Sequence, residues 1–273
     1  MLVAPLAPHS PWQPARRYEN AYANEPFQPA NKPSFNEADV SDKPLYARDL
    51  PLLTEEEVIR WMRWWRRSLA TGRSLDDLIR GVWEELSARG QLANTYIIFA
   101  PDNGYLWGEH RQKGKGNPYQ ESIRTIMYVW GPGVVPGEDT NLVSNIDLLP
   151  TFMDIAGQPI PEWADGRSLM PLFRGERPPW RSMFLVQNKR MTDDEGNSEE
   201  GSGTLWAALT TSEWTYTKYN TEAEYYDLVA DPFELNNAAA SLDPAFVAAV
   251  DERLKALRVC VGAECRSLEE APL

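Results

Sequence analysis

Histidine and cysteine are scarce in this sequence, which has two of each among its 273 residues. Cys260 and Cys265 lie close together near the carboxyl end, far from either histidine and without the two-residue spacing of a redox motif. That arrangement excludes a histidine–cysteine zinc site and a thioredoxin-like active site. A local disulfide, which would imply an oxidising compartment, and two free thiols both stay open.

Long apolar runs are also missing. No run approaches the roughly 20 apolar residues that cross a bilayer, and the start, Met1 to Pro5, is too short and too interrupted by proline for a signal peptide. We therefore expect no membrane partner and a chain that is soluble by itself. Its location in the cell stays open, because the sequence has no export signal to interpret.

Positive charge is in deficit. The chain has 27 Lys and Arg against 40 Asp and Glu, which gives a net charge of -13 and an isoelectric point near 4.7. Such a surface repels polyanions at low salt, so we expect no nucleic-acid partner. It also disfavours non-specific capture of heavily sulfated polymers.

The rest of the composition, with 42% apolar and 25% charged residues, is typical of a globular protein. Residues 4–51 are rich in proline, asparagine and alanine, which predicts a long irregular segment. Thr54 and Glu57 have the spacing of a capping box and predict the start of a helix. A second amphipathic helix is expected over residues 75–89, with Gly90 as its carboxyl-terminal cap.

Short apolar runs follow these helices. Residues 96–100 are rich in β-forming side chains and predict a buried strand, and a second run covers residues 126–130. A further helix is expected over residues 147–156. Because a helix followed by a buried strand is half of a βαβ unit, the pattern predicts an α/β fold with a parallel sheet.

The pattern changes near Gly175. Beyond it we expect three short strands, at residues 183–187, 205–210 and 214–219. A polar hairpin loop is expected at residues 193–203, and a last helix at residues 244–257. We therefore predict two domains: an α/β part at residues 1–175 and a small antiparallel α+β subdomain at residues 176–273.

The densest candidate site is Ala100-Pro101-Asp102-Asn103-Gly104, directly after the first predicted strand. Ligands bind at the carboxyl ends of strands in open α/β sheets. The carboxylate of Asp102 and the amide oxygen of Asn103 are hard donors suited to Ca²⁺ or Mg²⁺. A plain Asx turn is the competing interpretation, because Asp-Asn-Gly is also favourable turn chemistry.

Four further residues are candidates. Lys115 lies between two glycines, which allow its backbone to approach an anion closely. His9 lies in a proline-flanked loop that could hold it for proton transfer. His110 and Arg111 follow Gly108-Glu109. Taken alone, the lysine is equally a solvated loop charge and His9 an exposed terminal histidine.

Several blocks of the sequence resemble the sulfatase family, of the bacterial arylsulfatase type, and they occur in that family's order. They are NTYIIFAPDNGY at residues 94–105 with Gly108-Glu109-His110-Arg111, KGNPYQESIR at 115–124, SNIDLLPT at 144–151, DGRSL at 165–169, PSFNEADVSDKP at 33–44, and YYDL and DPFELNN within 225–237. The resemblance extends over nearly the whole chain.

This resemblance implies a fold like that of alkaline phosphatase, with a mixed sheet flanked by helices that is incomplete in this chain, and hydrolysis of a sulfate ester by a formylglycine and a calcium ion. By the matching motifs, Asp102 and Asn103 would be calcium ligands, with Mg²⁺ less suited. Lys115 and His9 would be catalytic: the first contacts a sulfate oxygen and the second assists proton transfer. His110 and Arg111 would line the substrate mouth. The expected partner is a sulfated small molecule or glycan.

The sequence departs from the family at the nucleophile. The Cys/Ser-x-Pro-x-Arg motif that yields formylglycine does not occur in these 273 residues, and neither Cys260 nor Cys265 is followed by its Pro and Arg. We therefore expect that the first half of the sulfatase domain is lacking, that it could be a partner of this chain, and that the cut sheet exposes apolar faces. We expect the chain to be inactive alone.

Two other functions stay open. One is a non-catalytic remnant that binds calcium or a partner. The other is a related phosphodiesterase or phosphonate hydrolase, because that superfamily shares metal ligands, although the Gly-Glu-His-Arg and Gly-Lys-Gly blocks favour sulfate esters. The sequence does not identify the particular ester.

Overall fold

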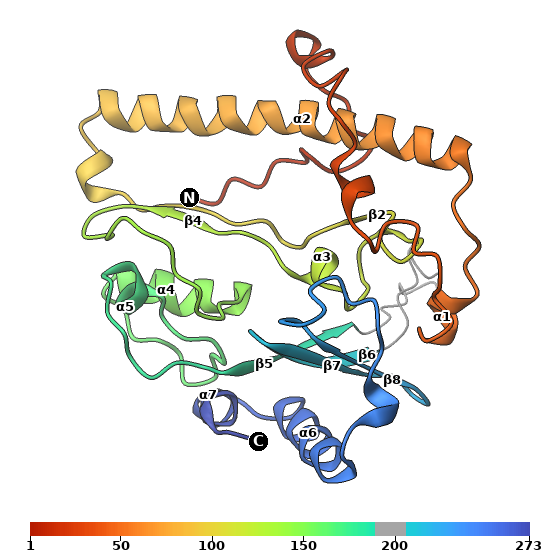
Figure 1. The fold of residues 1–273 in the computed structure, drawn as a ribbon. Coiled ribbons are helices and arrows are strands. Elements are labelled where there is room, and N and C mark those ends of the chain that lie inside the picture. The colour runs from red at the N-terminus through yellow and green to blue at the C-terminus, as the bar shows by residue number, and fades with distance from the viewer. Residues whose placement is uncertain (189–205) are drawn as a thin grey trace, which may run out of the picture.

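The computed structural model describes residues 1–188 and 206–273. The expected hairpin loop at residues 193–203 and the first residue of the expected strand at 205–210 lie outside this part. Figure 1 shows the helices and strands, which follow in chain order: η1 (Arg16–Tyr18), η2 (Gln28–Asn31), α1 (Leu45–Arg48), α2 (Glu55–Ala88), η3 (Leu92–Asn94), β1 (Ile97–Phe99), β2 (Leu106–Trp107), β3 (Lys113–Gly114), α3 (Gln120–Ile123), β4 (Tyr128–Trp130), η4 (Asn145–Asp147), α4 (Leu148–Ile155), α5 (Met170–Phe173), β5 (Met183–Asn188), β6 (Trp206–Thr211), β7 (Trp214–Lys218), β8 (Ala223–Asp227), η5 (Ala239–Ser241), α6 (Pro244–Leu257) and α7 (Ala263–Glu270).

The long helix α2 lies along one side of the molecule (Figure 1). Its predicted capping box is confirmed, because the Thr54 hydroxyl accepts from Glu57 N–H and the Glu57 carboxylate accepts from Thr54 N–H. The prediction of two separate helices is wrong: one helix of 34 residues runs through Gly72. A glycine inside a helix costs about 1 kcal/mol relative to alanine, which is too little to end it. Gly90 follows with a φ of +64°, as expected of a carboxyl-terminal cap.

No helix in residues 1–188 or 206–273 combines the length and apolarity needed to cross a membrane.

Strands β1 and β4 form a two-stranded antiparallel sheet, in which Ile98 lies opposite Val129. The expected α/β class is confirmed, but the expected parallel sheet is not found, because the described sheets are all antiparallel. An apolar run indicates burial and cannot indicate the direction of the partner strand. Burial is itself partial, since Tyr128 is 65% exposed and Ile126 is 58% exposed. The expected exposure of apolar side chains along this sheet is thus present.

The carboxyl-terminal part is built on a four-stranded antiparallel sheet of order β5-β6-β7-β8. Helices α6 and α7 lie on one face of it (Figure 1), and the core between them includes Leu209, Tyr216, Val250 and Leu254. The predictions of strands β5, β6 and β7 and of helix α6 are confirmed to within about one residue. Strand β8 and helix α7 were not predicted. The boundary near Gly175 stays a prediction.

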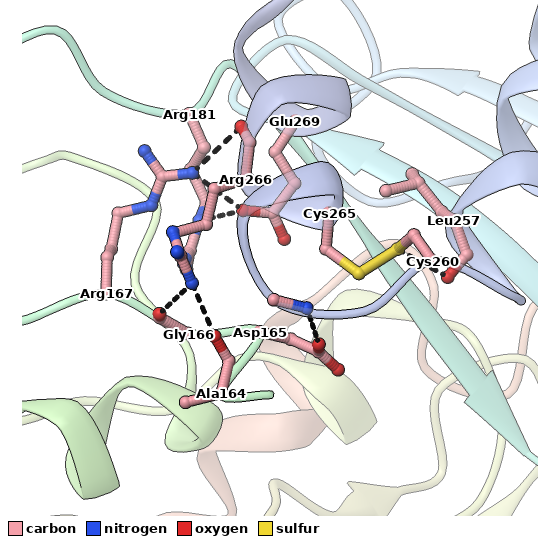
Figure 2. The surroundings of a disulfide bond; sticks show 11 residues. Ala164, Asp165, Gly166, Arg167, Arg181, Leu257, Cys260, Cys265, Arg266 and Glu269 are labelled. Atoms are coloured by element: carbon pink, nitrogen blue, oxygen red, sulfur yellow. Dashed lines mark hydrogen bonds and ion pairs between the residues drawn. A yellow bond between two sulfur atoms is a disulfide. The ribbon is translucent and has the colours of Figure 1, made fainter. Parts of the chain in front are cut away.

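The two cysteines form a disulfide, which decides the alternative that the sequence left open. Cys260 and Cys265 have Cα atoms 5.2 Å apart and close the loop between α6 and α7 (Figure 2). In that loop Gly262 N–H donates to the Asp165 carboxylate over 2.7 Å. A Cβ at Gly262 would lie 2.0 Å from the carbonyl oxygen of Glu162, so only glycine fits this close approach.

A buried ion-pair network lies beside the disulfide (Figure 2). The guanidinium of Arg181 donates to both carboxylate oxygens of Asp147, over 2.7 and 2.6 Å, and both side chains are 0% exposed. Its Nε atom donates to Glu269 over 2.9 Å, and Arg167 donates to the same carboxylate over 3.0 Å. Asp147 immediately precedes α4 and Glu269 lies in α7, so the network joins the middle of the chain to its end.

Replacement of Arg181 tests this network. We expect Arg181→Met to lower the free energy of unfolding by about 3–5 kcal/mol, because it leaves the Asp147 carboxylate buried without its partner. The matched control is Arg177→Met, since Arg177 is 67% exposed and pairs with Asp139 at 3.4 Å. Exposed pairs of this kind contribute about 1 kcal/mol or less. Urea unfolding measures both, and similar losses in the two variants would contradict the assignment.

Candidate functional site

The loop after β1 carries the two predicted metal ligands. Asn103 N–H donates to the Asp102 carboxylate over 2.9 Å, which is the turn contact expected from the competing interpretation. The Asn103 amide nitrogen donates to the carbonyl of Gly104 over 2.7 Å, so its amide oxygen is free to accept from elsewhere. The turn and the donor set therefore coexist. Asp102 is exposed and Asn103 half-buried.

Lys115 lies beside this loop, although twelve residues separate it from Asn103. Its Nζ atom donates to the Asn103 amide oxygen over 3.3 Å. Helix α3 holds the two segments together: Gly104 N–H donates to the Ser122 carbonyl over 2.9 Å, and Gly116 N–H to the Ser122 hydroxyl over 3.1 Å. The structure thus brings Asp102, Asn103 and Lys115 to one place, and their functional roles stay predictions.

An open groove of about 600 Å³ adjoins the loop. It is lined by Pro101, Asn103 and Gly104 on one side and by residues of α3 and the segment after it on the other; these are Gln120, Glu121, Arg124, Thr125 and Ile126. The lining residues include the amides Asn103 and Gln120 and the carboxylate Glu121.

His9 is exposed and does not contact Lys115 in this structure. Its Nδ1 atom lies 2.9 Å from the carbonyl oxygen of Ser10. The loop is fixed three residues further on by Trp12, whose ring centroid lies 6.3 Å from that of Tyr105 and 5.4 Å from that of Trp107. Trp12 therefore anchors the segment that follows His9 against Tyr105 and Trp107, and the part of His9 in proton transfer stays a prediction.

The aromatic cluster of Trp12, Trp64, Tyr105 and Trp107 flanks this region. The ammonium group of Lys113 lies 4.2 Å from the centroid of the Trp64 ring, a cation–π contact. Burial lowers the pKa of Lys113 and raises the pKa of Tyr105.

His110 and Arg111 hold backbone segments together. Arg111 donates to the carbonyl oxygens of Glu37 and Leu50, over 2.8 and 2.7 Å, and so ties the amino-terminal loop in place. His110 is 0% exposed, and its ring stacks on Tyr119 with centroids 4.0 Å apart. Their contacts in this chain are with protein groups, and a part in substrate binding stays a prediction.

Sequence analysis missed a buried group of carboxylates around His110. Glu37, Glu109 and Glu234 are 6%, 1% and 1% exposed, and Glu121 is partly buried. No spacing in the sequence reveals this group, because its members are drawn from three distant segments. All four carboxylates did fall within the sulfatase-like blocks. Burial raises the pKa of Glu234 well above its usual range.

The donors at the loop suit a calcium ion in kind. Asp102 and Asn103 contribute hard oxygen atoms, and calcium takes roughly six to eight such ligands, so these two would be part of a larger set. The contact between Lys115 and Asn103 places an ammonium group beside these oxygens. An anionic group bound there would have a positive charge next to it.

Gly104 offers a test of the loop geometry. A Cβ at this position would lie 2.1 Å from the Glu121 carbonyl oxygen and 3.1 Å from that of Arg124, which are backbone atoms. We expect Gly104→Ala to lower the free energy of unfolding by about 1–3 kcal/mol. The control is Gly81→Ala in α2, where no atom lies within 4 Å and the free energy should rise by up to about 1 kcal/mol. Denaturant titration distinguishes the two signs; a stabilised Gly104→Ala would refute the close approach.

Solved structures share this fold. BT4656 in complex with its substrate D-glucosamine-2-N,6-O-disulfate superposes with a TM-score of 0.67 at 23% identity, covering 92% of this chain and 62% of that one. The phosphonate monoester hydrolase of Agrobacterium radiobacter gives a TM-score of 0.69 at 24% identity, covering 92% and 55%. At these identities the likeness establishes the fold, of the alkaline-phosphatase-like class.

Sequence comparison identifies the family. N-acetylglucosamine-6-sulfatase of Bos taurus is 32% identical over 98% of this chain and 52% of its own length. The chain therefore spans about half the length of the relatives it matches. A family model described as N-sulphoglucosamine sulphohydrolase, C-terminal, matches residues 108–259, and one described as Sulfatase matches residues 1–158. The chain belongs to the sulfatase family.

Proposed function

We propose that this chain provides part of the active site of a sulfuric ester hydrolase. The observation that carries the proposal is the 3.3 Å contact between Lys115 Nζ and the Asn103 amide oxygen at the carboxyl end of β1. It places an ammonium group beside two hard oxygen donors, next to an open groove. A sulfate ester needs this combination of a metal site and a cationic donor.

Each residue has a distinct task in this proposal. Asp102 and Asn103 hold a calcium ion, which when bound polarises the sulfate ester. Lys115 donates to a sulfate oxygen and stabilises the negative charge that grows on the leaving oxygen. His9, tethered by Trp12, gives a proton to the departing alcohol.

The covalent step requires a nucleophile that this chain does not encode as a recognisable motif. Cys260 and Cys265 are joined in a disulfide and neither is available as a thiol. The formylglycine therefore has to come from a polypeptide segment other than these 273 residues. Hydrolysis of a sulfate ester then requires both this chain and the segment that supplies the formylglycine.

The substrate we propose is a small sulfated amino sugar. Three relatives that match 98% of this chain carry the name N-acetylglucosamine-6-sulfatase. The half-buried rings of Trp64, Tyr105 and Trp107 are of the type that packs on sugars. The net charge of -13 opposes long sulfated polymers, so a monosaccharide or short oligosaccharide is the better match.

The proposal is tested by translating the DNA upstream of the Met1 codon in the continuous frame. If that frame encodes a Cys/Ser-x-Pro-x-Arg motif, the joined protein is assayed on an aryl sulfate, glucosamine 6-sulfate and a phenyl phosphonate monoester. We expect sulfate release from the sugar and none from the 273-residue chain alone. Preference for the phosphonate would establish the related hydrolase instead. A stop codon with no such motif nearby would leave a non-catalytic, calcium- or partner-binding module.

Lys115→Ala in the joined protein is expected to lower kcat for the sulfate ester roughly 10²- to 10³-fold, because one donor to the developing charge is lost. Treatment with a calcium chelator should abolish turnover, and added Ca²⁺ should restore it. The matched control is Lys255→Ala, since Lys255 pairs with Glu252 on the exposed side of α6. Full activity of the Lys115 variant, or equal losses in both variants, would count against the assignment.

A further inference from the structure

One ring nitrogen of His110 has a hydrogen-bond partner, and the other has none among the described residues. Its Nδ1 atom lies 2.7 Å from a carboxylate oxygen of Glu37, and an ionised carboxylate only accepts, so Nδ1 carries the hydrogen. The Nε2 atom is buried and has no hydrogen-bond partner within residues 1–188 and 206–273. A buried polar atom of this kind needs an explanation.

Two carboxylates lie close to the His110 ring. One ligand atom from each of His110, Glu121 and Glu234 lies within 4.8 Å of the others. Glu234 is 1% exposed, and its other contact is the 2.8 Å bond that it accepts from Gln120 N–H. A ring nitrogen of His110 and the two carboxylates are therefore close enough together to hold one ion.

The charges around this point do not balance. Lys32 is shared by Glu109 and Glu121, with Nζ–O distances of 2.7 and 2.9 Å. Lys43 lies 3.5 Å from Glu37. The positive groups are Lys32 and Lys43, while the carboxylates are Glu37, Glu109, Glu121 and Glu234, with Asp42 beside Lys43. Neither lysine pairs with Glu234, and a buried carboxylate without a paired cation is costly.

We propose that His110, Glu121 and Glu234 bind a divalent transition-metal ion of the zinc class. The ion would accept the Nε2 lone pair and the two carboxylate oxygens, and it would give the buried Glu234 carboxylate a positive partner. Glu37 supports it as the carboxylate behind the histidine, an arrangement typical of metal-bound imidazoles. The nitrogen ligand separates this site from the oxygen-only calcium donors at Asp102 and Asn103.

The ion would link three parts of the chain. His110 follows β2, Glu121 lies in α3, and Glu234 lies in the turn after β8. Through His110, the amino-terminal loop that carries Glu37 is joined as a fourth. Because His110 is 0% exposed, a role in holding these segments together fits this site.

The experiment uses the 273-residue chain, purified in chelator, with its histidines labelled with ¹⁵N. Having only His9 and His110, the protein gives ring signals from two residues, and His9→Ala removes the exposed one. We expect one equivalent of Zn²⁺ to shift the Nε2 signal of His110 in both the parent chain and His9→Ala. A His110 signal that stays unchanged, or a ring with a proton on both nitrogens in the presence of zinc, would overturn the proposal.

Affinity provides the second measurement, by competition with a chromophoric chelator. Glu37→Gln should weaken zinc binding roughly 10- to 100-fold by loss of the supporting carboxylate, and Glu234→Gln at least as much. The matched controls are His9→Ala and Asp102→Ala, which alter other candidate ligands and should bind zinc with parent affinity. Parent-like binding by Glu234→Gln, or loss of zinc in Asp102→Ala, would contradict the site while leaving the proposed sulfatase function untouched.

Discussion

The ion pair of Arg181 and Asp147 is the constraint that connects the middle of the chain to its carboxyl end. Both side chains are removed from water, so each charge depends on the geometry of the other. Asp147 also accepts from Arg167 N–H and Ser144 N–H, over 2.9 and 2.8 Å, which fixes the turn before α4. Through Glu269 the same network reaches α7. Neither part can move without breaking several charge-assisted bonds.

A second buried group connects the segment that carries Lys115 to the four-stranded sheet of the carboxyl-terminal part. Glu224 on β8 is 0% exposed and accepts from the hydroxyls of Tyr119, Tyr219 and Tyr226. Tyr119 immediately precedes α3, the helix that positions Gly104 and the Lys115 loop. Burial raises the pKa of the Glu224 carboxyl. The sheet of the carboxyl-terminal part thus contacts the residue before α3, and α3 in turn positions the candidate site. The sulfatase-like blocks extend across both of these parts.

Local signals in the sequence predicted the features that depend on near neighbours. The capping box at Thr54, the cap at Gly90 and helix α6 are confirmed, since each is set within a few residues. The continuity of α2 and the antiparallel pairing of β1 with β4 were missed, because both depend on tertiary packing. For the site, the sequence grouped Asp102 with Asn103. The pairing of His110 with Glu37 spans 73 positions, and no periodicity encodes such a distance.

The candidate calcium donors and the buried histidine cluster share α3. Gly104 and Gly116 both donate to Ser122, and Glu121 precedes it in the same short helix. A helix of four residues has little stability of its own and takes its position from its contacts. An ion held by Glu121 would therefore also fix the spacing between Asn103 and Lys115. On this argument the charge at the buried cluster sets the geometry of the groove, although the two sites use different ligand chemistry.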